Sequence, residues 1–374
     1  MIREPITYIS GSVFSNTSMS CYTVHDTIRL PAASSSVCFG SEDLLTVGSV
    51  DGSLRLYHLP SPRVIKAVRQ LGDEVSSAAW SKLYDADHGV VWIASGRKVY
   101  CFDLAISKPS MILSATDAQK VLEIGEDEDD VLNELSVNEN KKSLFFTTDN
   151  GTVGLVDLST YEVSRMKTNH NSICGSVRAI PSRPNEAVSG GYDSTLLHFD
   201  TVQRSTLSRH KITVPEPSAG VSLSPSFVLS LDVSSTGMVA AGLADGRVWF
   251  GAGGDRNLPS TQKKRARKWE GLRETDSISV QIAEGPVVGV SFVDPTTLVT
   301  CTLLGKLAKH TISYSEEGKV ELQQSWSSET KIVEKVNAMT ANSKWLVLAG
   351  LSKDAKGVAE VWKPESSDAN ISVP

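Results

Sequence analysis

Short runs of alternating or continuous apolar residues cover most of the chain, and turn residues separate them. Typical runs are SLRLYHL, TVGLVDL and WLVLAG, and several are joined by Asp-Gly or Asn-Gly, as in VDGS, DNGT and ADGR. These dipeptides favour tight hairpin turns because both central residues of such a turn take positive φ. Apolar stripes with the i, i+3, i+4 spacing of a helix are scarce. The pattern predicts an all-β, antiparallel chain.

One hairpin pattern recurs along the chain: a strand, an acid or amide, a tight turn and a second strand. The clear copies align without gaps at 49–59, 147–158, 190–200 and 242–252, and weaker copies lie at 95–104, 302–312 and 352–364. The residue that ends the second strand recurs roughly every 50 residues. These anchor positions are Tyr57, Phe102, Val156, Phe199, Gly251, His310 and Trp362. We therefore expect seven units of one repeated structure.

The fourth unit carries the fullest motif. His170 precedes the unit, Ser189 and Asp193 lie close to the turn, and Phe199-Asp200 ends the second strand. This arrangement resembles the WD-repeat β-propeller family, in which a His, a Ser or Thr, the turn Asp and the Trp of a Trp-Asp pair form a hydrogen-bonded row. By this resemblance the four residues are a structural blade network, but phenylalanine cannot donate the indole N–H, so the last bond is lost. A catalytic acid and base is the alternative, which the recurrence of the motif disfavours.

The resemblance covers essentially the whole chain and implies one seven-bladed propeller at 1–364, followed by a tail at 365–374. A lone blade cannot bury both faces of its sheet, so blades must stack, and a closed ring leaves only short edges. Closure needs a latch, and we expect an N-terminal strand near 21–30 to complete the last blade. The expected blades span roughly 31–70, 75–115, 131–167, 172–211, 226–272, 285–326 and 334–364.

Positions just before the turn acid are expected on the top face, where the resemblance implies that peptides bind. Tyr192 is the best partner-binding candidate because it is aromatic and expected to be exposed. The full set is Tyr192, Asp149, Val50, Ala244 and Leu303.

The sharpest charge feature is the basic run KKRARK at 263–268. Three interpretations remain open: a solvated loop, a nuclear localisation signal, or a phosphate contact on RNA with Trp269 stacking on a base. The residues concerned are Lys263, Lys264, Arg265, Arg267, Lys268 and Trp269. The acidic run GEDEDD at 125–130 is either solvated or a site that captures a basic partner peptide.

Composition excludes several classes of protein. The net charge of −6 over 374 residues is not a global nucleic-acid footprint. No apolar run resembles a signal-peptide core or approaches the roughly 18 residues of a membrane helix. The five cysteines lie far apart without a CxxC pair, which is typical of reduced thiols. We expect no metal, no cofactor, no membrane contact, and an intracellular protein of the nucleus, the cytoplasm or both.

Catalytic motifs such as GxSxG, HExxH and GxxxxGK[ST] do not occur. The expected inner strands, including SSVCFG, CGSVRAI and FVLSLDV, are almost uncharged. That pattern disfavours a propeller enzyme, which would need acids or histidines at the ring axis. We therefore expect a non-enzymatic scaffold that binds other proteins or peptides and is monomeric outside its complex.

By resemblance, one concrete form of this scaffold is a substrate receptor of a cullin-4 ubiquitin ligase, which docks on the ligase adaptor through a WD-x-Arg element. That Arg is missing after Asp103, Asp157 and Asp200, and Arg204 lies two residues late. The alternative is a scaffold in nuclear assembly or ribosome biogenesis, or one that contacts RNA through the basic run.

Overall fold

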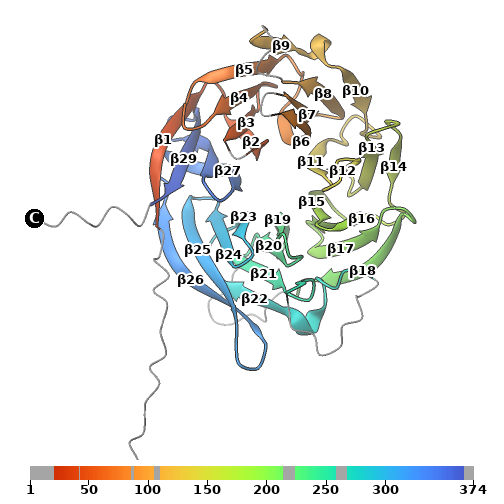
Figure 1. The fold of residues 1–374 in the computed structure, drawn as a ribbon, viewed down its shortest axis with the longest axis vertical. Helices are drawn as coiled ribbons and strands as arrows, with labels where there is room; N and C mark the ends of the chain where they lie inside the picture. Colours follow the sequence, from red (N-terminus) through yellow and green to blue (C-terminus); the bar gives the residue numbers. More distant parts are fainter. Residues whose placement is uncertain are drawn as a thin grey trace, which may run out of the picture.

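The computed structural model describes residues 21–41, 43–85, 88–104, 110–213, 224–257 and 268–365. The strands form seven antiparallel blades around a central axis (Figure 1). The expected all-β, seven-bladed propeller is confirmed. Within the described ranges, the helical elements are two short 3-10 turns, Ala115–Asp117 and Glu274–Asp276.

Each of the first six blades is built in chain order from its inner strand to its outer strand. Blade one holds β2 (Ser34–Phe39), β3 (Leu44–Ser49), β4 (Leu54–His58) and β5 (Val64–Arg69). Blade two holds β6 (Val75–Asp85), β7 (His88–Ser95), β8 (Lys98–Asp103) and β10 (Lys120–Glu123). Blade three holds β11 (Leu132–Val137), β12 (Ser143–Thr148), β13 (Val153–Asp157) and β14 (Val163–Arg165). Blade four holds β15 (Cys174–Ile180), β16 (Arg183–Gly191), β17 (Thr195–Asp200) and β18 (Ser205–Lys211).

The remaining blades follow the same plan. Blade five holds β19 (Val228–Val233), β20 (Val239–Leu243), β21 (Arg247–Gly251) and β22 (Ser277–Gln281). Blade six holds β23 (Val287–Asp294), β24 (Thr297–Thr302), β25 (Lys306–Tyr314) and β26 (Val320–Glu329). Blade seven holds β27 (Val333–Ala341), β28 (Leu346–Ser352), β29 (Gly357–Pro364) and the N-terminal strand β1 (Tyr22–Leu30).

The ring closes with the N-terminal strand, as expected. Strand β1 pairs antiparallel with β29, from Tyr22 opposite Pro364 to Leu30 opposite Gly357. Figure 1 shows the red N-terminal strand beside the blue C-terminal blade. The first and last parts of the chain therefore share one sheet.

Two outer strands lie beyond the boundaries expected from the repeat. In blade two the outer strand is β10, because the preceding segment, β9 (Ile112–Ser114), pairs in parallel with β5 of blade one. In blade five the outer strand β22 follows the long connection that contains the basic run. The hairpin pattern located the second and third strands of each unit well, but it carries no signal for where a connection returns to the sheet.

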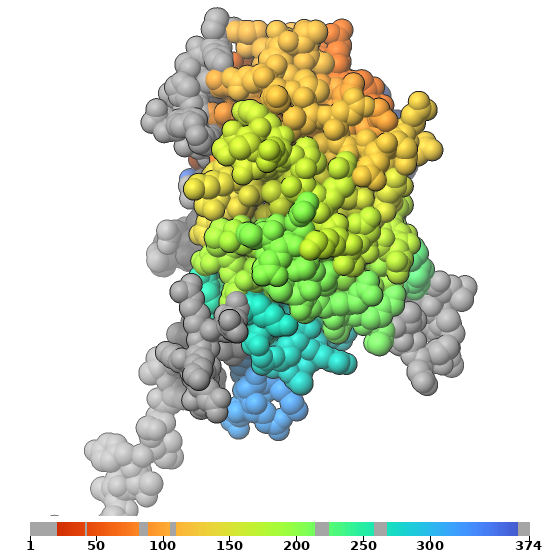
Figure 2. All heavy atoms as spheres, turned by 90° about the vertical axis from the view of Figure 1, so that its right-hand side faces the viewer, coloured from red at the N-terminus to blue at the C-terminus, as the bar shows by residue number. Residues whose placement is uncertain are grey.

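The core lies between the blades. Seven clusters of buried apolar residues occur in the described part, and each combines side chains from two neighbouring blades. At the interface of blades three and four, for example, Phe145 and Val153 pack in one cluster with Val177, Leu197 and Phe199. Seen from the side, blades two to five form one continuous wall (Figure 2). Burial of each such side chain stabilises the fold by about 1.5–3 kcal/mol, so the blades depend on one another.

Candidate functional site: the top face and the central channel

A hydrogen-bonded row in blade four brings three of the expected motif residues together. His170 donates from Nδ1 to Asp193 Oδ1 at 2.9 Å, and its Nε2 contacts Ser189 Oγ at 2.8 Å. Asp193 also accepts from the Asn171 N–H at 3.1 Å. Burial raises the pKa of Asp193, but the bonds from His170 and Asn171 outweigh it and hold that pKa below its usual range. The row joins the connection that enters the blade to its turn.

The fourth motif residue takes no polar part in this row. Phe199 is fully buried in the cluster between blades three and four. His170 and Ser189 are also buried, 4% and 0% exposed, so no substrate reaches them. A structural role for these residues stays a prediction.

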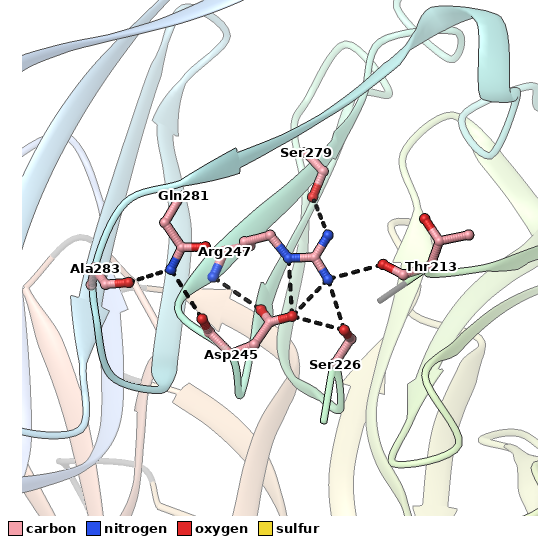
Figure 3. A network of polar contacts seen from close by, with 7 residues as sticks. All are labelled: Thr213, Ser226, Asp245, Arg247, Ser279, Gln281 and Ala283. Atoms are coloured by element: carbon pink, nitrogen blue, oxygen red, sulfur yellow. Dashed lines mark hydrogen bonds and ion pairs between the residues drawn. The ribbon is translucent and has the colours of Figure 1, made fainter. Parts of the chain in front are cut away.

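In blade five, different residues tie the entering connection to the turn of the blade (Figure 3). Arg247 donates to Asp245 Oδ2 from Nη2 at 2.6 Å and from Nε at 2.9 Å, and Ser226 donates to the same oxygen at 2.7 Å. Arg247 also reaches Ser279 Oγ on the outer strand at 3.1 Å and the Thr213 carbonyl at 3.0 Å. Asp245 occupies the turn position of Asp193, and Arg247 donates to it where His170 donates to Asp193 in blade four.

Blade seven uses a buried glutamate that sequence reasoning missed. Glu360 is 0% exposed and accepts the backbone N–H groups of Lys331, Ile332 and Val333. Its second oxygen accepts the indole N–H of Trp362 at 3.0 Å. An acid within an otherwise apolar third strand, GVAEVW, was the available signal.

The acidic connection into blade three is folded onto the turn of that blade. Asp130 is buried and accepts the N–H groups of Glu126 and Asn150, both at 3.0 Å. The Asn150 side chain donates to Asp127 at 3.0 Å. The carboxylates of 126–129 remain exposed. One member of the run therefore anchors it and the others project to solvent.

The expected top-face residues differ in exposure. Val50 is 44% exposed, whereas Asp149, Ala244 and Leu303 are half-buried. The more exposed residue of the blade-six turn is Leu304, at 76%. Leu303 was assigned to the top face by aligning the turns of the seven units. Because the blade-six turn has no acid to fix that alignment, the assignment missed the exposed residue by one position.

Tyr192 is half-buried rather than freely exposed. Its ring stacks on Phe227, from the connection into blade five, with centroids 5.3 Å apart and planes 7° from parallel. Burial and the nearby carboxylate of Asp149 both raise the pKa of the Tyr192 phenol. Asp149 in turn accepts from Asn133 Nδ2 at 3.0 Å, at the start of an inner strand. Asn133 also donates to the Cys174 carbonyl of blade four at 3.2 Å and lines the channel, so the turn of blade three is connected to blade four and to the channel wall.

Trp269 is not available for base stacking, contrary to the RNA interpretation. It is 2% exposed and packs in the core between blades four and five. Its indole donates to the Gly237 carbonyl at 2.7 Å, and its backbone N–H donates to Glu186 at 3.0 Å. Lys268 is exposed, with Nζ 3.2 Å from the Leu207 carbonyl. The rest of the basic run, Lys263, Lys264, Arg265 and Arg267, lies outside the described residues.

The inner strands enclose a channel with a cavity of 790 Å³. Four charged side chains line it, Glu134, Lys141, Arg178 and Asp232, so the expectation of an almost uncharged axis is wrong. Arg178 pairs with Glu134, and its Nε lies 3.5 Å from Asp232 Oδ1. Glu134 belongs to LNELSV, an inner strand whose single acid the expectation overlooked.

No protein-family model matches this chain. The architecture of seven blades is consistent with a WD-repeat protein, and the propeller fold is typical of non-enzymatic scaffolds.

Among the described residues, no helix is long and apolar enough to cross a membrane. The same ranges hold no group of three or more His, Cys, Asp or Glu side chains placed to bind a metal ion. None of the five cysteines forms a disulfide, and burial raises the pKa of Cys101 to about 12.

Proposed function

We propose that the protein is an interaction scaffold whose top face binds a segment of a partner protein. The observation that carries this is the continuity of one polar and aromatic surface across three blades. It runs from the acidic connection at 125–130 through Asp149 and Asn133 to the stacked Tyr192–Phe227 pair. Aromatic rings beside hydrogen-bonding groups are characteristic of residues that contribute strongly to protein interfaces.

The charge of this surface favours a basic partner segment. Glu126, Asp127, Glu128 and Asp129 are all exposed, and Arg165 pairs with the first of them at 3.0 Å. Carboxylates on such a rim steer a basic segment and raise its association rate, an effect that salt weakens.

A pull-down with mass spectrometry tests this function. The variant Glu128→Gln/Asp129→Asn removes two exposed charges and keeps the buried Asp130. Its matched control is Glu316→Gln/Glu317→Gln, in the turn between β25 and β26. We expect partners with basic segments to be depleted in the first variant only. Equal recovery with wild type and both variants would rule out the acidic rim as the binding surface.

Finer roles follow from resemblance. The order of the units is similar to WD repeat-containing protein 53, and substrate reception for a cullin-4 ubiquitin ligase is the role that this likeness favours. The alternative is an assembly scaffold of the nucleus or of ribosome biogenesis. The same pull-down separates them, because only the first recovers the cullin-4 adaptor.

We also propose that the basic run at 263–268 is a nuclear localisation signal. Neutralising Lys264, Arg265 and Arg267 should move the protein to the cytoplasm, measured by imaging of a tagged chain. An unchanged distribution would remove this proposal. The RNA alternative now rests on charge alone, since Trp269 is buried.

A further inference from the structure

A second row of an acid, an imidazole and a hydroxyl group crosses blade four. It consists of Glu186 on β16, His198 on β17 and Ser208 on β18, and strand pairing places Ser208 opposite His198. Glu186 Oε2 lies 2.8 Å from His198 Nε2, and Ser208 Oγ lies 3.1 Å from His198 Nδ1. A nucleophile, a base and a group that orients the base need these contacts to act together.

This row differs from the row around His170 in the exposure of its hydroxyl group. Ser189 is 0% exposed, whereas Ser208 on the outer strand is half-buried and reaches solvent. The imidazole of His198 is itself fully buried. A reagent can therefore meet the Ser208 hydroxyl, while the base beside it is shielded from water.

The charge of Glu186 decides which nitrogen of the ring carries the proton. Burial raises the pKa of Glu186, but the bonds from the His198 ring, the Trp269 N–H and Arg183 lower it to about 2. A carboxylate only accepts hydrogen bonds, so the neutral ring donates its Nε2–H to Glu186. The lone pair of Nδ1 then faces Ser208 and can accept the hydroxyl proton.

Lys268 and Trp269 complete the surroundings of the row. The Trp269 ring stands edge-on to the His198 ring, with centroids 5.1 Å apart and planes at 76°. Lys268 Nζ lies 3.2 Å from the carbonyl oxygen of Leu207, the residue before Ser208. An ammonium group beside the nucleophile favours the oxyanion that forms when a hydroxyl group attacks an ester.

We infer that Ser208 is an activated nucleophile that takes an acyl group from small reactive carboxylic esters. Ser208 Oγ bonds to the ester carbonyl carbon while its proton passes to His198 Nδ1, and Glu186 balances the charge of the imidazolium. The bond from that carbon to the leaving oxygen then breaks, and the leaving oxygen takes the proton from His198. The products are acylated Ser208 and a free alcohol. The site goes beyond the top-face function, because none of its residues belongs to that face.

Acetylation of the purified full chain by p-nitrophenyl acetate tests the inference. We expect release of about one equivalent of p-nitrophenol, in a phase faster than the background hydrolysis of the ester. Peptide mass spectrometry should then place the acetyl group on Ser208 and leave the buried Ser189 unmodified. Absence of acetyl-Ser208 from the wild-type chain would overturn the inference, and this outcome needs no variant.

A pair of variants on one strand locates the nucleophile. Ser208→Ala should slow the release of p-nitrophenol at least about tenfold. Ser205→Ala is the matched control, because Ser205 lies on the same strand and is also half-buried. Equal release by wild type and both folded variants, checked by circular dichroism, would contradict the site. The top-face variant Glu128→Gln/Asp129→Asn should react like wild type, so this inference and the proposed function fail independently.

The pH profile of acetylation tests Glu186, which acts through His198 as a positioning residue. The rate should fall in acid, because a protonated ring cannot accept the Ser208 proton. The charged groups around the ring are Glu186, Arg183 behind it and Lys268. In Glu186→Gln the midpoint of the profile should move to lower pH, since the carboxylate that stabilises the protonated ring is gone. An unmoved midpoint in the folded variant would contradict the role of Glu186.

Discussion

At the scale of single residues, three blades solve one structural task with different chemistry. The connection that enters the blade must be tied to the turn or to the third strand. Blade four uses His170 and Asp193, blade five uses Arg247 and Asp245, and blade seven uses Glu360. Each device satisfies buried donors and acceptors, which is the common physical requirement.

Removal of one hydrogen-bond partner in the blade-four row should lower the stability of the fold. Ser189→Ala leaves His170 Nε2 buried without its 2.8 Å contact. We expect the free energy of unfolding to fall by about 1–3 kcal/mol in urea titrations. The exposed Ser172→Ala serves as the control, with no change outside about 0.5 kcal/mol. Equal stability of the two variants would mean that the row contributes nothing.

Glu186 should make stability depend on acid pH. Burial raises its pKa, but bonds from the His198 ring, the Trp269 N–H and Arg183 outweigh this and lower it to about 2. A carboxyl group with a lowered pKa stabilises the fold above its usual value of 4.5, and this contribution is lost as the pH falls toward 2.

The comparison with Glu186→Gln measures this contribution. We expect the wild type to exceed the variant by on the order of 3 kcal/mol at pH 6, because 1.36 kcal/mol corresponds to each pKa unit. The difference should shrink as urea titrations are repeated toward pH 3. A constant difference over that range would show that Glu186 acts by packing and not by charge.

At the scale of secondary-structure elements, the latch decides whether the ring is closed. Deletion of residues 1–30 removes β1 and leaves the edge of β29 without its partner. We expect loss of the cooperative thermal transition, followed by circular dichroism. Deletion of 1–20 keeps β1 intact and is the control, with an unchanged melting curve. Cooperative melting of the longer deletion would show that the latch is dispensable.

The elements also show where a repeat pattern stops being informative. The hairpins were predictable because Asp-Gly and Asn-Gly turns sit between alternating runs, as in β12 and β13. The outer strands β10 and β22 were not, since an edge strand is short, half-exposed and held by backbone bonds. Strand β9 joins a different blade altogether, which no local pattern encodes.

At the scale of the whole molecule, the blades should unfold together. Each buried cluster is shared by two neighbours, so no blade keeps its core alone. Phe199→Ala at one interface should lower global stability by about 3–5 kcal/mol. Calorimetry should show one transition at lower temperature. A second transition confined to part of the ring would contradict this coupling.

The sequence by itself determined the fold class, the seven units and the latch, because periodic strands and turn chemistry are local properties. It also located His170, Ser189 and Asp193, because their spacing in the fourth unit matches the motif of the family that the chain resembles. The tertiary structure decided which side chains are exposed: it buried Trp269 and stacked Tyr192 on Phe227. It alone brought Glu134, Arg178 and Asp232 together, because each comes from a different blade and ring closure sets their spacing.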